Sequence, residues 1–229
     1  MREISFEEQT VNSANPLARF AHRSRMSTAT GLVSNLCRER GTVVDFGVEP
    51  GLFLQSLGEA RPDVSLIGYD LSMPSTSSQV KYVESLATVA ARSVDVLTAF
   101  EVCEHLYDDE LDALLADAAR ILKPNGAFVI SVPIMYGLAI APKVSNRMIR
   151  SRSLKSEYSP AEFLKAMVGI RVERPADPRD THKGFDFREL RDTVSQHFVI
   201  DETHTSPVPQ APWWMSSQFF MTCRPKAKT

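Results

Sequence analysis

The sequence contains little of several features that mark particular classes of protein. It has only three cysteines, Cys37, Cys103 and Cys223, which are far apart and fit neither a disulfide framework nor a zinc site. The net charge of −2 provides no general basic field to attract nucleic acid. No run approaches the ~18 apolar residues that span a bilayer. The charged start MREISFEEQT lacks the apolar core of a signal peptide. We therefore expect a cytoplasmic protein with no nucleic-acid partner and no membrane span.

The remaining composition is ordinary for a globular enzyme. Of the 229 residues, 43% are hydrophobic and 24% are charged, and the chain shows no internal repeat. This length suits one large α/β domain or two small ones. We predict a single domain over residues 1–229, with an N-terminal helical segment at about 1–41 and a lid-like insertion at about 133–180.

Short apolar runs alternate with helical patterns along most of the chain. The runs that indicate strands are 42–46, 64–70, 80–84, 94–100, 127–132, 198–204 and 218–223. Helical patterns cover about 17–40, 51–60, 108–122 and 186–197. The run AFVISV is almost continuously apolar, which is typical of a central parallel strand buried on both faces. The alternation predicts an α/β fold with a doubly wound sheet.

The segment TVVDFGVEPGLFL, residues 42–54, is the most informative part of the chain. A short strand leads into Asp45, then into a turn with Gly47 and Gly51, and then into a helix. Such a turn brings backbone N–H groups and a helix N-terminus up to a nucleotide-like ligand. The same pattern also occurs as a simple tight connection between a strand and a helix, so by itself it leaves both interpretations open.

Four segments in the right order resemble the class I S-adenosylmethionine-dependent methyltransferases. They are VVDFGVEPG, IGYDLS, DVLTAFEVCEHL and ARILKPNGAFVISVP. The resemblance implies a Rossmann-like doubly wound sheet of seven strands in the order 3-2-1-4-5-7-6, with strand 7 antiparallel. It also implies S-adenosylmethionine as the cofactor.

The resemblance also assigns cofactor-binding roles by position. Asp70 would accept both ribose hydroxyls, and Leu71 would pack against the adenine. The glycines would let the backbone approach the methionine end of the cofactor. The residues assigned in this way are Asp45, Gly47, Gly51, Asp70, Leu71, Phe100 and Glu101.

The glycine-rich turn departs from the family pattern at one position. Glu49 stands where the family usually has its middle glycine, and a carboxylate there could repel the carboxylate of the cofactor. This departure keeps open an alternative function, a methyltransferase-like binding or scaffold protein without catalytic activity. We favour an enzyme that transfers methyl to an oxygen, nitrogen or carbon of a small-molecule acceptor.

His105 is the predicted catalytic base, because its unperturbed pKa lies near neutrality and it follows the fourth strand. It is also the end of an E-x-x-E-H motif, which resembles the metal-binding motif of small-RNA 2′-O-methyltransferases and some ubiquinone-pathway O-methyltransferases. The potential ligands are Glu101, Glu104, His105 and, downstream, His182. We predict a reaction without metal, because many family members with the same EHL sequence are assigned none; a divalent ion is the alternative.

The insertion suggests two kinds of acceptor. Its cations, including Lys143, Arg147, Arg150 and Arg152, could meet an anionic acceptor. The apolar run PIMYGLAIAP could touch a lipid-linked one. The simpler interpretation is a solvated charged face over a small apolar contact.

Overall fold

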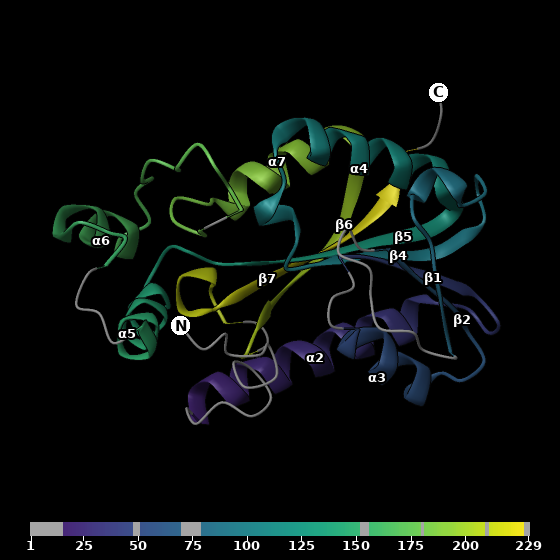
Figure 1. Cartoon of the computed structure of the whole chain (residues 1–229), viewed down its shortest axis with the longest axis horizontal. Coiled ribbons are helices and arrows are strands. Elements are labelled where there is room, and N and C mark those ends of the chain that lie inside the picture. The colour runs from purple at the N-terminus through teal and green to yellow at the C-terminus, as the bar shows by residue number, and fades with distance from the viewer. Residues whose placement is uncertain are drawn as a thin grey trace.

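The computed structural model describes residues 16–47, 51–69, 79–151, 156–179, 181–208 and 211–226 (Figure 1). The predicted ribose ligand Asp70, its neighbour Leu71 and the unusual Glu49 lie outside these residues. The N-terminal segment is described from Pro16 onward.

The strands form one sheet in the order β3-β2-β1-β4-β5-β7-β6. The pairs from β3 to β5 are parallel, and β7 runs antiparallel to both β5 and β6. The predicted fold class is therefore confirmed. The strands are β1 (Thr42–Phe46), β2 (Ser65–Tyr69), β3 (Val80–Tyr82), β4 (Val94–Phe100), β5 (Leu122–Pro133), β6 (Phe198–Ser206) and β7 (Gln218–Pro225).

Helices cover both faces of the sheet (Figure 1). One face carries α2 (Pro16–Leu36) and α3 (Leu52–Ala60), and the other carries α4 (Asp108–Ile121) and α7 (Phe187–His197). Each face has its own apolar core, because the strands between them are apolar on both sides. The helix α2 ends at Leu36, four residues before the predicted end of this helix at residue 40. Arg40 itself has a φ of 52°, and the chain turns there toward β1.

The central strands β4 and β5 follow the predicted apolar runs but differ in where β5 begins. The strand starts at Leu122, directly after α4, rather than at Ala127. Leu122 pairs with Val94, and the register then shifts between Val94 and Val96. The sequence KPNG, which lies between the predicted helix 108–122 and the predicted strand 127–132, is thereby accommodated as an irregularity inside the strand.

The insertion folds into helices beyond the carboxyl end of β5 (Figure 1). They are α5 (Ile140–Ser151) and α6 (Pro160–Met167). Ser159 caps α6, since its hydroxyl accepts the backbone N–H of Glu162 and the Glu162 carboxylate accepts that of Ser159. A separate apolar cluster packs this region, and it comprises Tyr136, Ile140, Tyr158, Ala166 and Val172. We call residues 133–180 the lid.

Three short 3₁₀ turns complete the described elements. They are η1 (Leu86–Thr88), η2 (Cys103–His105) and η3 (Trp213–Met215). Of these, η2 lies directly after β4 and carries the second half of the E-x-x-E-H motif. Within the described residues, no helix is long and apolar enough to cross a bilayer.

Asp95 ties the start of β4 to β1 and β5. Its carboxylate accepts the Thr42 N–H at 2.8 Å and pairs with Lys123 at 2.6 Å and Arg38 at 2.9 Å. Burial by itself raises the pKa of Asp95, but the hydrogen bonds from Lys123 and Thr42 outweigh it and hold the pKa below its ordinary value. The charged carboxylate is therefore the stabilising form.

We expect Asp95→Ala to lower the free energy of unfolding by about 2 kcal/mol at pH 7, measured by urea denaturation. Since the pKa is lower in the folded state, this difference should shrink as the pH falls through that value. Asp201→Ala is the control, because Asp201 pairs with Arg224 at the surface and is 57% exposed. A loss of the same size in both variants would contradict the role of Asp95.

Candidate active site

The candidate site lies at the carboxyl ends of β1 and β4, which are neighbours in the sheet. At this point the strand order reverses direction, which is where open α/β sheets bind ligands. Gly47 follows β1 with a φ of 83°, and Gly51 precedes α3 with a φ of 82°. Both conformations are strained for residues with a side chain. A Cβ on Gly47 would also lie 2.8 Å from a methyl carbon of Val102.

Asp45 is buried beside this turn, with only 4% of its surface exposed. The Thr98 hydroxyl of β4 lies 2.5 Å from one of its carboxylate oxygens. Burial, followed by the negative charge of Asp45, raises the pKa of the nearby Tyr82. The contact with Thr98 fixes the orientation of the carboxylate.

Aromatic rings line the ends of the same strands. Phe46 and Tyr69 stack with ring centroids 5.1 Å apart, and Phe100 meets Phe53 edge-on at 4.7 Å. Phe46, Tyr69 and Phe100 are half-buried. The rings thus place apolar surface beside the glycine turn at the end of β1.

Glu101 adopts a left-handed backbone conformation, with a φ of 57°, directly after β4. Its carboxylate accepts hydrogen bonds from Ser131 at 3.1 Å and from Gln218 at 2.9 Å, and it pairs with Arg25 at 3.2 Å. Arg25 was not among the residues that the sequence predicted for the site. No local sequence pattern could reveal this contact, because it joins α2 to the residue that follows the carboxyl end of β4.

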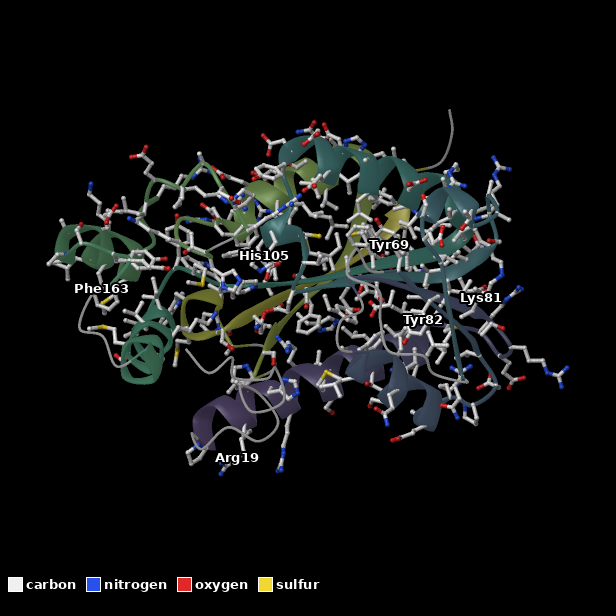
Figure 2. All side chains as sticks on the ribbon, viewed as in Figure 1. Arg19, Tyr69, Lys81, Tyr82, His105 and Phe163 are labelled. Carbon is white, nitrogen blue, oxygen red and sulfur yellow. The ribbon has the colours of Figure 1, made fainter. Side chains whose placement is uncertain are left out.

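The other three predicted metal candidates lie together. One ligand atom from each of Glu104, His105 and His182 falls within 4.8 Å of the other two. The Nε2 atoms of the two histidines are 3.0 Å apart, and His182 Nε2 lies 3.8 Å from a Glu104 oxygen. Figure 2 shows His105 on the side of the sheet that faces the lid, with Phe163 of α6 at the far end of the lid. Glu101 is not part of this cluster.

Glu104 is fully buried, and neither of its carboxylate oxygens has a hydrogen-bond partner among the described residues. Burial, reinforced by the negative charge of Glu101, raises the pKa of Glu104 well above its ordinary value. An isolated buried carboxyl group of this kind is costly, so its presence calls for a functional explanation.

His105 is oriented by the lid. Its Nδ1 lies 3.3 Å from the carbonyl oxygen of Pro178. Because a carbonyl can only accept, this contact favours the tautomer with the proton on Nδ1, in which Nε2 faces His182. The lid therefore favours one tautomer of His105.

Lys143 fixes the lid to the end of the sheet. Its ammonium group donates to the backbone carbonyls of Ile134 at 3.0 Å and Ser217 at 2.7 Å. Desolvation lowers the pKa of Lys143 to about 8, because it outweighs the attraction of the nearby Glu101 and Glu104. Two of its three donors are thus committed to the protein, which weakens the predicted role of Lys143 in binding an anionic acceptor. Arg152 lies outside the described residues, and Arg147 and Arg150 belong to α5.

A doubly wound sheet in this strand order, with a glycine turn after β1 and acids after β4, defines a class I S-adenosylmethionine-dependent methyltransferase. A family model described as a methyltransferase domain matches residues 18–169, and the chain belongs to this family. The protein is therefore an S-adenosylmethionine-dependent methyltransferase. No curated protein sequence matches the chain.

Solved structures show the same fold at low identity. A protein from Pyrococcus horikoshii OT3 is 15% identical, with a TM-score of 0.59 and 96% of each chain covered. The 1,6-didemethyltoxoflavin N1-methyltransferase of Burkholderia thailandensis, solved with S-adenosylhomocysteine, is 17% identical, with a TM-score of 0.55 and coverage of 92% of this chain and 86% of that one. The geranyl diphosphate C-methyltransferase of Streptomyces coelicolor is 13% identical, with a TM-score of 0.52 and coverage of 90% and 82%.

Proposed function

We propose that S-adenosylmethionine binds at the carboxyl ends of β1, β2 and β4. The residues fit it: Gly47 and Gly51 place no side chain at either end of the turn, and the first turn of α3 carries no acidic residue to compete for its N–H groups. Phe100 and Glu101 border the same space from β4. Asp70 and Leu71 stay predictions, since they lie outside the described residues.

The bound cofactor supplies a methyl group on a positively charged sulfur. What the protein must add is alignment, exclusion of water and, for an oxygen or nitrogen acceptor, a way to remove a proton. We propose that the acceptor is a small molecule with a hydroxyl oxygen, held under the lid beside Glu104, His105 and His182. Both kinds of acceptor that the sequence suggested, anionic and lipid-linked, are compatible with this position.

We further propose that these three residues bind a divalent metal ion. The observation that carries this proposal is the buried Glu104 carboxyl, whose oxygens have no partner among the described residues but lie near the histidine cluster. Two nitrogen ligands about 2.1 Å from an ion and at right angles to each other are about 3.0 Å apart. The two histidine nitrogens have this separation. The proposal replaces our prediction of a reaction without metal, because the sequence could not show that the three side chains meet.

A divalent ion at this position would lower the pKa of a bound hydroxyl group. The protein's own part is to hold the ligands in place: Pro178 of the lid orients the His105 ring, and His182, which follows the lid, lies against that ring. Without an ion, His105 Nε2 is the remaining candidate base, as the sequence predicted.

Metal binding is tested by titrating Mn²⁺ into chelator-treated protein and measuring heat. We expect about one ion per chain, and His182→Ala should weaken binding by at least about tenfold. His197→Ala is the matched control, because His197 is exposed at the end of α7 and should leave binding unchanged. Equal affinity in wild type and His182→Ala would refute the site and return His105 to the role of base.

The single domain, the lid and the cytoplasmic location are further parts of the proposal. The separate apolar cluster of the lid, its contacts with His105 and its place beyond the end of β5 support a role over the acceptor. The three buried free cysteines agree with a reducing compartment.

A further inference from the structure

Among the described side chains around the lid, Arg174 differs from three other arginines in having no carboxylate partner. Arg171 pairs with Asp186 and Glu189, Arg179 pairs with Glu110, and Arg188 pairs with Asp186. Among the described residues, no carboxylate oxygen lies within ion-pair distance of Arg174. Its positive charge is therefore the one in this group that the protein does not neutralise by contact.

The guanidinium of Arg174 is held next to the histidine cluster. Its Nη2 donates to the backbone carbonyl of Glu104 at 2.5 Å, and its central carbon lies 5.3 Å from the centroid of the Phe185 ring. Its Nε is buried and has no hydrogen-bond partner among the described residues. The side chain as a whole keeps partial contact with solvent.

The backbone beneath Arg174 is also fixed. Gly184 packs against it, and a Cβ on Gly184 would lie 2.7 Å from the Arg174 Cα. Gly184 has a φ of 73°, so both its conformation and its packing favour glycine. This close approach sets Arg174 beside Phe185, three residues after His182, and so beside the proposed acceptor site.

A guanidinium group presents several N–H donors in a planar fork that matches carboxylate and phosphate. Leaving the buried Nε–H of Arg174 without a partner is unfavourable, and a ligand anion would relieve it. Lys143, one of the four lid cations that the sequence offered for this role, is already bound to two carbonyls. We propose that Arg174 binds an anionic group of the acceptor, a carboxylate or a phosphate, close to the hydroxyl that receives the methyl group. This inference rests on the proposed function and names the substrate class of that site.

The side-chain Nε–H of arginine can be observed directly by ¹⁵N–¹H NMR, so the Arg174 signal itself reports whether an anion binds there. Uniformly ¹⁵N-labelled full-length protein, saturated with S-adenosylhomocysteine, would be titrated separately with inorganic phosphate and with acetate. The Arg174 signal is assigned by its loss in Arg174→Lys. We expect it to shift saturably, with half-saturation at about 1 mM. The anion that produces the tighter response identifies the phosphate or the carboxylate class.

Arg191→Lys is the control, since Arg191 is exposed and pairs with its neighbour Asp192. It should leave the phosphate or acetate response of Arg174 unchanged. In Arg174→Lys, backbone signals around His182 and Phe185 should respond to the same anion at least about tenfold more weakly. An Arg174 signal that does not move, or backbone shifts that persist unchanged in Arg174→Lys, would overturn the inference. If S-adenosylhomocysteine still binds when either of these results is found, the proposed cofactor site is kept and only the inference about Arg174 is rejected.

Discussion

Gly47→Ala is expected to weaken binding of S-adenosylhomocysteine by about 100-fold. The residue has a φ of 83°, where a side chain costs about 1–3 kcal/mol, and its new methyl group would lie 2.8 Å from Val102. Both strains are relieved only if the turn moves away from the end of β1, where the cofactor is proposed to bind. Isothermal titration calorimetry of the wild type and the variant measures the difference.

Gly31→Ala provides the control for this experiment. Gly31 lies inside α2, and a Cβ there would meet no atom within 4 Å. Since alanine favours a helix over glycine, this variant should bind the cofactor product as the wild type does and unfold at a slightly higher temperature. Unchanged affinity in Gly47→Ala would place the cofactor elsewhere. Absence of binding in the wild type would favour the alternative in which Glu49 has made the chain a scaffold.

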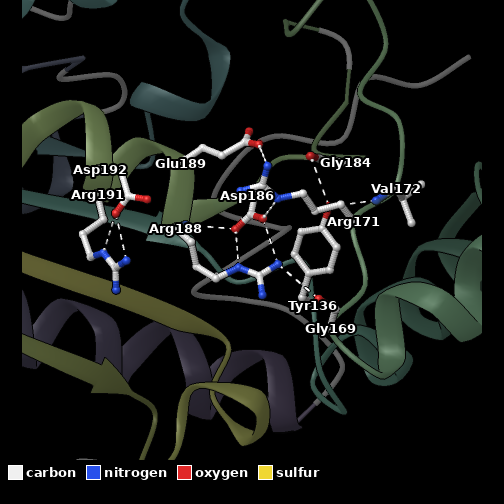
Figure 3. Close-up of polar contacts among 10 residues, drawn as sticks. All are labelled: Tyr136, Gly169, Arg171, Val172, Gly184, Asp186, Arg188, Glu189, Arg191 and Asp192. Carbon is white, nitrogen blue, oxygen red and sulfur yellow. Dashed lines mark hydrogen bonds and ion pairs between the residues drawn. The ribbon is translucent and has the colours of Figure 1, made fainter.

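Asp186→Ala is expected to lower the free energy of unfolding by about 3–5 kcal/mol. The Asp186 carboxylate is 1% exposed, pairs with Arg188 at 2.8 Å and with Arg171 at 3.3 Å, and accepts the Arg188 N–H at the start of α7. Arg188 in turn lies over the ring of Tyr136, whose hydroxyl bridges Gly184 and Val172 (Figure 3). Removing Asp186 therefore weakens the connection between α7 and the lid, which is left with the Arg171–Glu189 pair and the bond from Arg188 to the Gly169 carbonyl.

The contribution of charge is isolated by Asp186→Asn, which keeps an acceptor at the helix N-terminus. Burial by itself raises the pKa of Asp186, but hydrogen bonds from Arg188 outweigh it and lower the pKa. The difference between wild type and Asp186→Asn should therefore be full near neutral pH and vanish as the pH falls through the lowered value. Asp192→Asn, at an exposed pair on the same helix, should change stability by less than about 0.5 kcal/mol. A pH-independent loss in Asp186→Asn would contradict this account.

The sequence predicts the sheet well because its signals are local. Apolar runs buried on both faces, such as β4, and helices with one apolar face, such as α4, are patterns of neighbouring residues. The early start of β5 was missed, because KPNG has the composition of a turn and becomes part of the strand only through the residues that flank it, Leu122 and Ala127, which pair with β4. The register between two strands depends on both of them, so it cannot be predicted from the sequence of one strand alone.

The site could be predicted only in part for the same reason. The E-x-x-E-H motif indicates three neighbouring ligands, but the positive φ of Glu101 sends its carboxylate toward Arg25 and Gln218. Glu104 instead turns inward, to a histidine 78 positions further along the chain. Arg174 carried no sequence signal, since its distinctive property is the absence of a described carboxylate partner in the folded protein.

The position of β7 has a consequence for how the chain is made. It lies between β5 and β6, so two strands synthesised earlier have no neighbour on that side until Gln218–Pro225 has left the ribosome. The strands around β1 can pair first, whereas the apolar edge of β5 stays exposed until β7 pairs with it. Nascent chains arrested before residue 218 should accordingly hold a chaperone longer than released chains of all 229 residues.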